Sequence, residues 1–157
     1  MRVGSISILR ARPEAAGAVG TVYLVSCVSK KRLAPSRARD LYVSDWFKKA
    51  RRYVEASGCA WFILSAEYGL VRPDEVITPY EKTLNAMSVG ERRQWARKVI
   101  AQMEEAMPQV TRAVFLAGER YREFLTDHLK SCSITVEIPM QGLGIGKQLS
   151  WLDKNAP

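Results

Sequence analysis

Residues 61–80, WFILSAEYGLVRPDEVITPY, decide the fold of this chain because an apolar run gives way within them to a stiff polar segment. A short, continuously apolar run is typical of a strand that is buried on both faces. The residues that follow are too polar for a simple turn, and Pro73 and Pro79 fix φ on either side of Asp74. We therefore expect a buried strand that opens into a ligand-binding loop.

Outward from this segment, extended and helical patterns alternate along the chain. Short apolar strands separated by helices predict a mostly parallel sheet with helices on both faces. The expected fold is therefore α/β, a three-layer α/β/α sandwich with a central four-stranded sheet. The predicted strands are 21–25, 60–64, 113–117 and 134–138, and the predicted helices are 41–56, 88–107 and 119–129.

The length of 157 residues and the 47% hydrophobic content suit one domain with a substantial core. Residues 1–20 contain RARPEAAGAVG, which has small residues, Pro and Gly but little periodicity. We expect a loosely attached leader over residues 1–20 and a single α/β domain over residues 21–157.

The apolar runs TVYLVSCV and CAWFIL are too short to cross a bilayer, and no secretory signal pattern precedes them. The sequence therefore predicts a cytoplasmic protein that does not bind membranes. Cys27, Cys59 and Cys132 are odd in number and widely spaced, which favours buried free thiols over disulfides or a metal site. The single His128 has no partner at ligand spacing, so we expect neither a metal nor a cofactor.

The formal net charge of +8 favours a polyanionic partner, although scattered basic residues also serve solubility. Right-handed crossovers place the carboxyl ends of parallel strands at one edge of the sheet, where open α/β sheets bind their ligands. The segments that follow the four predicted strands should therefore meet there. They are SCVSKKRLAPSRARD, SAEYGLVRPDEVITPY, GERYREF and PMQGLGIGKQ.

The first and last of these segments have phosphate-binding character, because hydroxyls, ammonium groups and glycine amides converge on anions. Neither matches a standard nucleotide motif, and a solvated basic loop remains the alternative for the first. In the third segment, Gly118 lies at a strand-to-helix turn where exposed helix amides can face an anion, and a plain turn that needs a small residue is the alternative. The candidate substrate-binding residues are Ser26, Cys27, Lys30 and Lys31 after the first strand, Gly118 and Tyr121 after the third, and Gln141, Gly142 and Gly144 after the fourth.

The second segment offers groups for chemistry as well as binding. Ser65 can donate to a ligand oxygen, Tyr68 and Tyr80 can stack on a base or a sugar, and a carboxylate can act as a general base. Alternatively, Asp74 caps a turn and Tyr80 is a packing residue of the core. The candidates for catalysis are Asp74, Ser65 and Tyr80, with Glu67 or Glu81 as other carboxylates and with Glu67, Tyr68 and Gly69 as substrate-binding residues.

The motifs LVSCVSKK, DLYVSDWFKKAR, WFILSAEYGLVRPDEVITPYEKTL, FLAGERYREFL and IPMQGLGIGKQLSWL together resemble a family of small bacterial and phage domains of unknown function. The loop LSAEYGLVRPDEVITPY is similar to that of the peroxide-stress YaaA family. It is more distantly similar to the domain of archaeosine-forming enzymes that resembles uracil-DNA glycosylases. These resemblances imply a uracil-DNA glycosylase-like α/β fold and DNA or a nucleotide as the partner.

The implied reaction is cleavage of an N-glycosidic bond of a modified base, for which Asp74 is the best carboxylate candidate and Lys30 and Lys31 would hold phosphate. Uracil-DNA glycosylases usually carry Asp or Asn after the first strand and often a late His, whereas SCVSKKR and PMQGLGIGKQ have neither. Two interpretations stay open. The domain is either a glycosylase with a different acid–base arrangement or a non-catalytic module that recognises nucleic acid or a nucleotide in DNA modification, stress or phage defence.

Overall fold

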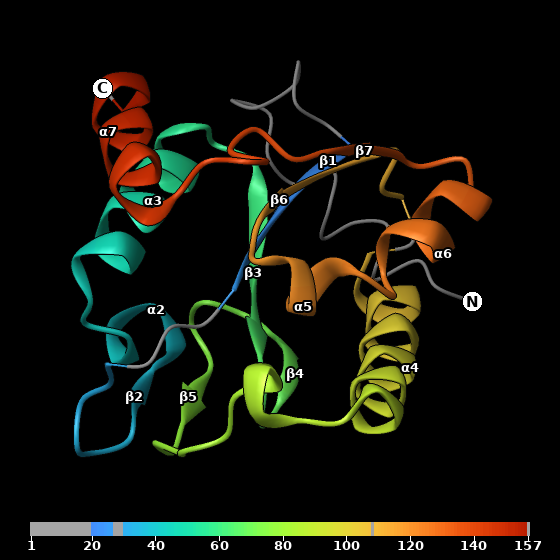
Figure 1. Ribbon diagram of the computed structural model, residues 1–157, viewed down its shortest axis with the longest axis horizontal. Helices are drawn as coiled ribbons and strands as arrows, with labels where there is room; N and C mark the ends of the chain where they lie inside the picture. The colour runs from blue at the N-terminus through green and yellow to red at the C-terminus, as the bar shows by residue number, and fades with distance from the viewer. Residues whose placement is uncertain (1–19, 27–29, 108, 157) are drawn as a thin grey trace.

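The computed structural model describes residues 20–26, 30–107 and 109–156. Its centre is a mixed five-stranded sheet with the strand order β4-β3-β1-β6-β7 (Figure 1). Four strands are parallel, and β4 pairs antiparallel with β3. The strands are β1 (Thr21–Ser26), β3 (Ala60–Ser65), β4 (Gly69–Val71), β6 (Arg112–Leu116) and β7 (Thr135–Glu137).

Helices cover both faces of this sheet, so the chain is an α/β protein. Figure 1 shows α3 and α7 on one side of the strands and α4, α5 and α6 on the other. The helices are α2 (Ala38–Leu41), α3 (Asp45–Ala56), α4 (Val89–Ala106), α5 (Glu119–Arg122), α6 (Thr126–Ser131) and α7 (Ile145–Asn155), with a 3-10 turn η2 (Leu84–Ala86).

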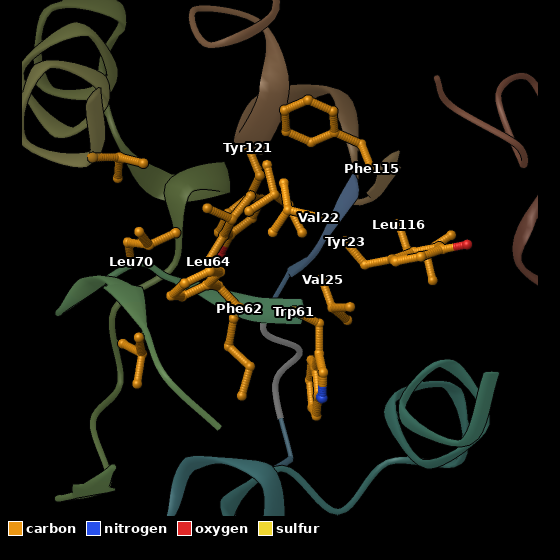
Figure 2. Close-up of a cluster of buried hydrophobic side chains, with 14 of the residues drawn as sticks. Val22, Tyr23, Val25, Trp61, Phe62, Leu64, Leu70, Phe115, Leu116 and Tyr121 are labelled. Carbon is orange, nitrogen blue, oxygen red and sulfur yellow. The ribbon is translucent and has the colours of Figure 1, made fainter. Parts of the chain in front are cut away.

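The core lies on both faces of the central strands because their side chains alternate between the two helical layers. Tyr23 pairs with Trp61 in the register of β1 and β3, and Trp61 contacts Phe47 of α3 with ring centroids 6.5 Å apart. Figure 2 shows Tyr23 and Trp61 directed to this side, whereas Leu64 and Leu70 gather on the other. This continuous burial is what the unbroken apolar runs of the sequence predict.

The four predicted strands are confirmed, but the sheet has a fifth strand that the sequence analysis interpreted as loop. Ser65 pairs with Gly69 in a tight hairpin between β3 and β4, and Gly69 adopts φ +79°. The side chain of Gln102 on α4 accepts from the amide of Leu70 at 2.8 Å and donates to the carbonyl of Tyr68 at 3.1 Å. The predicted four-stranded, mostly parallel sheet is thus a five-stranded mixed sheet.

A second antiparallel pair forms outside this sheet. β2 (Ser36–Arg37) pairs with β5 (Val76–Ile77), with Ser36 opposite Ile77 and Arg37 opposite Val76. Each strand has only two residues, too few for a period-two pattern to be visible in the sequence. This two-stranded ribbon lies at the lower left of Figure 1, beside α2.

Two of the three predicted helices are interrupted. Tyr42 is extended, and Ser44 begins α3 by accepting from the amide of Phe47 at 3.2 Å, so residues 41–56 do not form one helix. Residues 119–129 form α5 and part of α6, and the residues buried at helical spacing in both are Tyr121, Leu125 and Leu129. The third helix is confirmed as α4, with the capping box of Ser88 and Glu91.

Cys59 and Cys132 are free thiols, as predicted, but neither is buried. Cys59 is partly exposed, and Cys132 is exposed because it lies at the C-cap of α6, where its Sγ is 3.6 Å from His128 Nε2. Cys27 and almost all of the predicted leader, residues 1–20, lie outside the described residues. Within the described ranges, no helix is both long and apolar enough to cross a membrane.

Candidate ligand-binding rim

The carboxyl ends of the four parallel strands form one edge of the sheet, which we call the rim. Ser26, Ser65 and Leu116 end β1, β3 and β6. Because β1 lies between the other two, Ser65 and Leu116 flank Ser26, one strand spacing of about 4.8 Å away on each side. α3 follows β1 on one face and α5 follows β6 on the other, so the strand order reverses here, where open α/β sheets bind ligands.

A cluster of three hydroxyl groups lies at the β3 side of the rim, and we call it the hydroxyl cluster. Ser65 Oγ donates to Tyr80 Oη at 2.9 Å, and the hydroxyls of Tyr80 and Tyr42 are 2.6 Å apart. Ser65 is completely buried, and its Oγ also accepts from the amides of Glu67 at 3.2 Å and Tyr68 at 3.0 Å. The same hydroxyl therefore shapes the hairpin turn and anchors Tyr80.

Lys31 and Tyr68 enclose this cluster. Lys31 Nζ lies 4.5 Å from the ring centroid of Tyr80 and 5.8 Å from that of Tyr42, within the range of cation–π attraction. The rings of Tyr68 and Tyr80 meet edge to face at 5.6 Å, and Tyr68 Oη donates to the carbonyl of Thr78 at 3.1 Å. Four of the predicted site residues, Lys31, Ser65, Tyr68 and Tyr80, therefore lie together at the β3 side of the rim.

The β6 side of the rim holds a cavity of about 220 Å³, which we call the rim cavity. The loop between β7 and α7 forms one wall with Met140, Gln141 and Gly142, and the start of α5 forms another with Gly118 and Glu119. Its remaining lining consists of Phe115, Leu116 and Ala117 from β6 and its end, Arg122 of α5, Ile138, Leu143 and Gln148.

Hydrogen bonds fix the walls of the rim cavity in place. Gln148 Oε1 accepts from Trp46 Nε1 at 2.8 Å, and its Nε2 donates to the carbonyl of Leu143 at 2.7 Å, so one amide links α3, α7 and the loop. Arg122 Nε donates to the carbonyl of Ala117 at 3.2 Å. These bonds fix the walls of the cavity, and a preformed cavity of this kind reduces the ordering cost of binding a ligand.

Glycines leave the mouth of the rim cavity open. A Cβ atom built on Gly118, Gly142 or Gly144 meets no other atom within 4 Å. Gly142 has φ +83°, a conformation that favours glycine, and Gly144 is the N-cap of α7. The backbone is therefore accessible to a ligand at these three predicted positions, although Gly144 does not line the cavity itself.

Asp74, the predicted general base, lies apart from both groups. Its carboxylate pairs with the guanidinium of Arg39, and its side chain is 73% exposed. Arg39 also contacts Glu55 at 3.4 Å, which places Asp74 in a surface ion-pair network beside α3. Within the described residues, no hydrogen bond joins Asp74 to Ser65 or Tyr80.

The other predicted residues have mixed positions. Ser26 is buried at the end of β1, and Lys30 is exposed, with its carbonyl accepting from Val43 at 3.0 Å. Tyr121 packs edge to face on Trp95 at 5.8 Å and is buried, so it does not line the rim cavity. Glu67 pairs with Lys82 at 3.3 Å, and Cys27 lies outside the described residues.

Sequence reasoning missed Tyr42, Glu119, Arg122 and Gln148. Glu119 and Arg122 are three residues apart in GERYR and so share a helix face next to Gly118. Gln148 follows Gly144 by one helical turn. These spacings were visible, whereas the contact of Tyr42 with Tyr80 joins residues 38 positions apart and could not be read from a local pattern.

A larger cavity of about 480 Å³ lies between β4 and the last turns of α4, lined by Phe62, Leu70, Arg72, Glu75, Gln102, Glu105 and Ala106. Both polar groups of Gln102 are bonded to the hairpin backbone. The lining of this cavity includes no residue of β1, β6 or β7 or of the segments directly after them, so it lies on the β4 side of the sheet, away from the point between β1 and β6 where the strand order reverses. We therefore place the candidate site in the smaller rim cavity, because its position at the carboxyl ends of the parallel strands matters more than its volume.

Within the described ranges, no group of three or more His, Cys, Asp or Glu side chains could hold a metal ion. The groups available at the rim are hydroxyls, amides, ammonium and guanidinium groups, and the carboxylate of Glu119. Such a set can bind a neutral polar ring and its phosphates, because it supplies both donors and acceptors beside cations.

The fold and the rim define an α/β domain with a mixed sheet and a polar cavity at the carboxyl ends of its strands. The chain belongs to the family of unknown function DUF6884, whose model matches residues 22–154. It is 34% identical over 98 residues to the uncharacterized protein YfjM of Bacillus subtilis (strain 168). That match covers 58% of this chain and 61% of YfjM. No solved structure matches the chain.

Proposed function

We propose that this domain recognises a nucleic acid or a nucleotide, with one base in the rim cavity and the adjoining phosphate near Lys30 and Lys31. The observation that carries this proposal is the composition and position of the rim cavity. Gln141 and Arg122 offer side-chain donors and an acceptor, and the glycines expose the backbone beside them. An amide side chain can pair with a base edge through both of its polar groups.

The basic residues after β1 support the phosphate part of the proposal. Lys30 is exposed, and Lys31 approaches the hydroxyl cluster two strand spacings from the rim cavity. Two strand spacings are about 10 Å, which is comparable to the span of one nucleotide. The net charge of +8 favours the approach of a polyanion.

Binding to fluorescent single-stranded DNA, duplex DNA and RNA, with nucleotides as competitors, tests this proposal by fluorescence anisotropy. Gln141→Ala should weaken binding about tenfold, the equivalent of roughly 1.4 kcal/mol. Gln94→Ala, an exposed amide on α4, is the control and should not change affinity. Equal affinities for both variants and the unchanged protein would remove the rim cavity from the binding site.

The phosphate contacts have a separate test in the dependence of affinity on salt. Replacing Lys30 and Lys31 with Ala should reduce the slope of log K against log salt by about two, because two fewer phosphates are neutralised. Replacing Lys130 on α6 and Lys154 on α7 with Ala removes the same two positive charges from other parts of the molecule. This control should leave the slope nearly unchanged. A similar slope for both pairs would argue against a specific phosphate site.

The second candidate function is cleavage of an N-glycosidic bond, as the resemblance to uracil-DNA glycosylases implies. The observation that favours it is the carboxylate of Glu119 in the same cavity as Gln141. A carboxylate beside the sugar stabilises oxocarbenium character or activates water. Asp74 is the carboxylate that the sequence analysis predicts for this role. Its exposed side chain and its pairing with Arg39 suit the role less well.

Release of free base, measured by mass spectrometry, tests the second candidate on a panel of unmodified, damaged and hypermodified DNAs and nucleotides. If Glu119 is the carboxylate, Glu119→Gln should abolish release and Asp74→Asn should leave it unchanged. The reverse pattern would assign the role to Asp74. No release from any substrate, together with measurable binding, would leave recognition as the function.

A further inference from the structure

We propose that Leu33 is a wedge that enters the base stack of a nucleic-acid duplex when the rim binds. This inference rests on the proposed function and adds to it the form of the nucleic acid and the way it is deformed. Leu33 is 100% exposed, the largest exposed fraction of the four large exposed hydrophobic residues that the structure describes. A single exposed leucine is ordinary on a protein surface, so the argument depends on its surroundings.

The loop that carries Leu33 is anchored at its base. Lys31 and Tyr42 form an antiparallel bridge. The amide of Arg32 donates to the carbonyl of Leu41 at 2.8 Å, and the amide of Val43 donates to the carbonyl of Lys30 at 3.0 Å. Ser36 Oγ then donates to the carbonyl of Ala34 at 3.0 Å. Leu33 is therefore presented at the tip of a constrained loop.

Pro35 restricts the loop further, because it fixes its own φ and limits the residue before it. Beyond it, Arg37 of β2 pairs with Val76 of β5, which is another of the large exposed hydrophobic residues. Figure 1 shows this loop and the ribbon projecting together at the lower left of the molecule. The projection suits insertion into a groove.

Positive charge surrounds the exposed leucine. Lys30, Arg32 and Arg37 are exposed, and none of these three side chains has a hydrogen bond or an ion pair within the described residues. By contrast, Arg39, the next arginine, pairs with Asp74 and Glu55. Cations left without acidic partners around an apolar tip are complementary to phosphates on either side of a base step. They are not complementary to an apolar protein surface.

The loop also connects this tip to the rim. Lys31, two residues before Leu33, lies over the ring of Tyr80 in the hydroxyl cluster. Two extended residues span at most about 7 Å, so the Cα atom of Leu33 lies within about 7 Å of that of Lys31. Proteins that insert apolar side chains between base steps partly unstack them and kink the duplex, with arginines on the backbone or in the groove. The geometry assigns that role to Leu33 with Arg32 and Arg37 beside it.

A duplex that contains 2-aminopurine provides the test, because the fluorescence of this base rises several-fold when its neighbours unstack. The unchanged protein should raise the fluorescence at saturation. Leu33→Ala should lose at least half of that rise while its affinity falls by less than about tenfold. Val89→Ala removes another exposed apolar side chain, on α4, and should behave like the unchanged protein.

Arg32→Ala and Arg37→Ala should each reduce the salt slope by about one and keep the fluorescence rise at saturating protein. Circular dichroism of each variant checks that its fold is intact. Equal fluorescence rises for Leu33→Ala and the unchanged protein would overturn the wedge and leave the proposed recognition standing.

Failures of the wedge and of the proposed function are distinguishable. Binding to nucleotides or single strands without binding to a duplex would overturn the wedge alone. No binding to any nucleic acid or nucleotide would overturn both. Vesicles that contain phosphatidylserine serve as a second polyanion, and Leu33-dependent binding to these vesicles without duplex binding would overturn the wedge in favour of a lipid surface.

Discussion

Ser65 connects the turn of the β3–β4 hairpin to the candidate site. Its hydroxyl accepts from two backbone amides and donates to Tyr80, and its own carbonyl accepts from Trp95 Nε1 at 2.9 Å. A hydroxyl was predictable at the end of this strand, because the apolar run stops there. Its partner Tyr80 was also predicted as a site residue. The role of Ser65 in the turn could not be predicted, because it depends on the hairpin between β3 and β4.

Ser65→Ala should lower the free energy of unfolding by about 1–3 kcal/mol, because two amides lose their buried acceptor. Tyr80→Phe, which keeps the ring and removes one hydroxyl, should cost about 0.5–1.5 kcal/mol. Urea unfolding monitored by tryptophan fluorescence measures both. Ser150→Ala, at an exposed position of α7, is the control and should change the free energy by less than about 0.5 kcal/mol.

Glu137 gives the protein a pH-dependent contribution to stability. Its carboxylate accepts two hydrogen bonds from Arg112, at 2.6 and 2.7 Å, and this pairing lowers the pKa of Glu137 below its ordinary value of 4.5. A carboxyl whose pKa is depressed by folding stabilises the native state above its unfolded pKa. The contribution is then lost as the pH falls through the folded pKa.

Glu137→Gln should therefore lower the free energy of unfolding at pH 7 by no more than about 1 kcal/mol, because both side chains are about two-fifths exposed. The difference from the unchanged protein should shrink as the pH falls below 4.5. Urea unfolding at pH 7, 4 and 3 measures this, with Glu104→Gln as an exposed control. A difference that grows toward low pH would contradict this account of the ion pair.

At the scale of elements, the hairpin of β3 and β4 distinguishes what sequence patterns can and cannot predict. Three of the four parallel strands were predictable as continuous apolar runs between helical segments, and the fourth as the extended segment 134–138. β4 has three residues and β2 and β5 have two each, so no periodicity distinguishes them from loop. Gly69 lies at the tight turn of this hairpin with φ +79°. The partner that makes the turn stable, Gln102, lies 32 residues from Leu70 and has no local signal.

Gly69→Ala should destabilise the hairpin by at least about 2 kcal/mol. Its φ of +79° strains an alanine by about 1–2 kcal/mol, and the new Cβ would clash with Gln102 Oε1. Gly146→Ala is the matched change in the first turn of α7, where a Cβ meets nothing within 4 Å, and should stabilise by no more than about 0.5–1 kcal/mol. Thermal unfolding of both variants measures the change in stability. A loss of stability at Gly146→Ala similar to that at Gly69→Ala would contradict the special requirement for glycine at position 69.

At the scale of the whole molecule, the sheet topology determines which polar segments can meet. Parallel strands with right-handed crossovers predicted one shared rim, and the structure places the ends of β1, β3 and β6 side by side. The sequence could not predict that the polar residues divide into two groups, the hydroxyl cluster and the rim cavity. Nor could it separate Asp74 from them, because its pairing with Arg39 depends on how α2 packs beside the β2–β5 ribbon.

The excess of positive charge also acts at this scale. The formal charge of +8 attracts any polyanion, so binding alone does not locate a site. Within the described residues, the loop from Lys30 to Arg37 carries three cations that have no acidic partner, Lys30, Arg32 and Arg37, and this is the feature that connects the global charge to the proposed site. A recognition domain of this form should bind more weakly as the salt concentration rises.

The most direct test of the proposed function is a map of backbone amide chemical shifts by NMR during titration with a short DNA oligonucleotide and, separately, with single nucleotides. The account predicts shifts at the rim cavity, at Gly118, Gln141 and Gly142, and no shifts at Phe62, Gln102 and Ala106 around the larger cavity. Shifts confined to the larger cavity, or no shifts at saturating oligonucleotide and nucleotide, would contradict recognition at the rim.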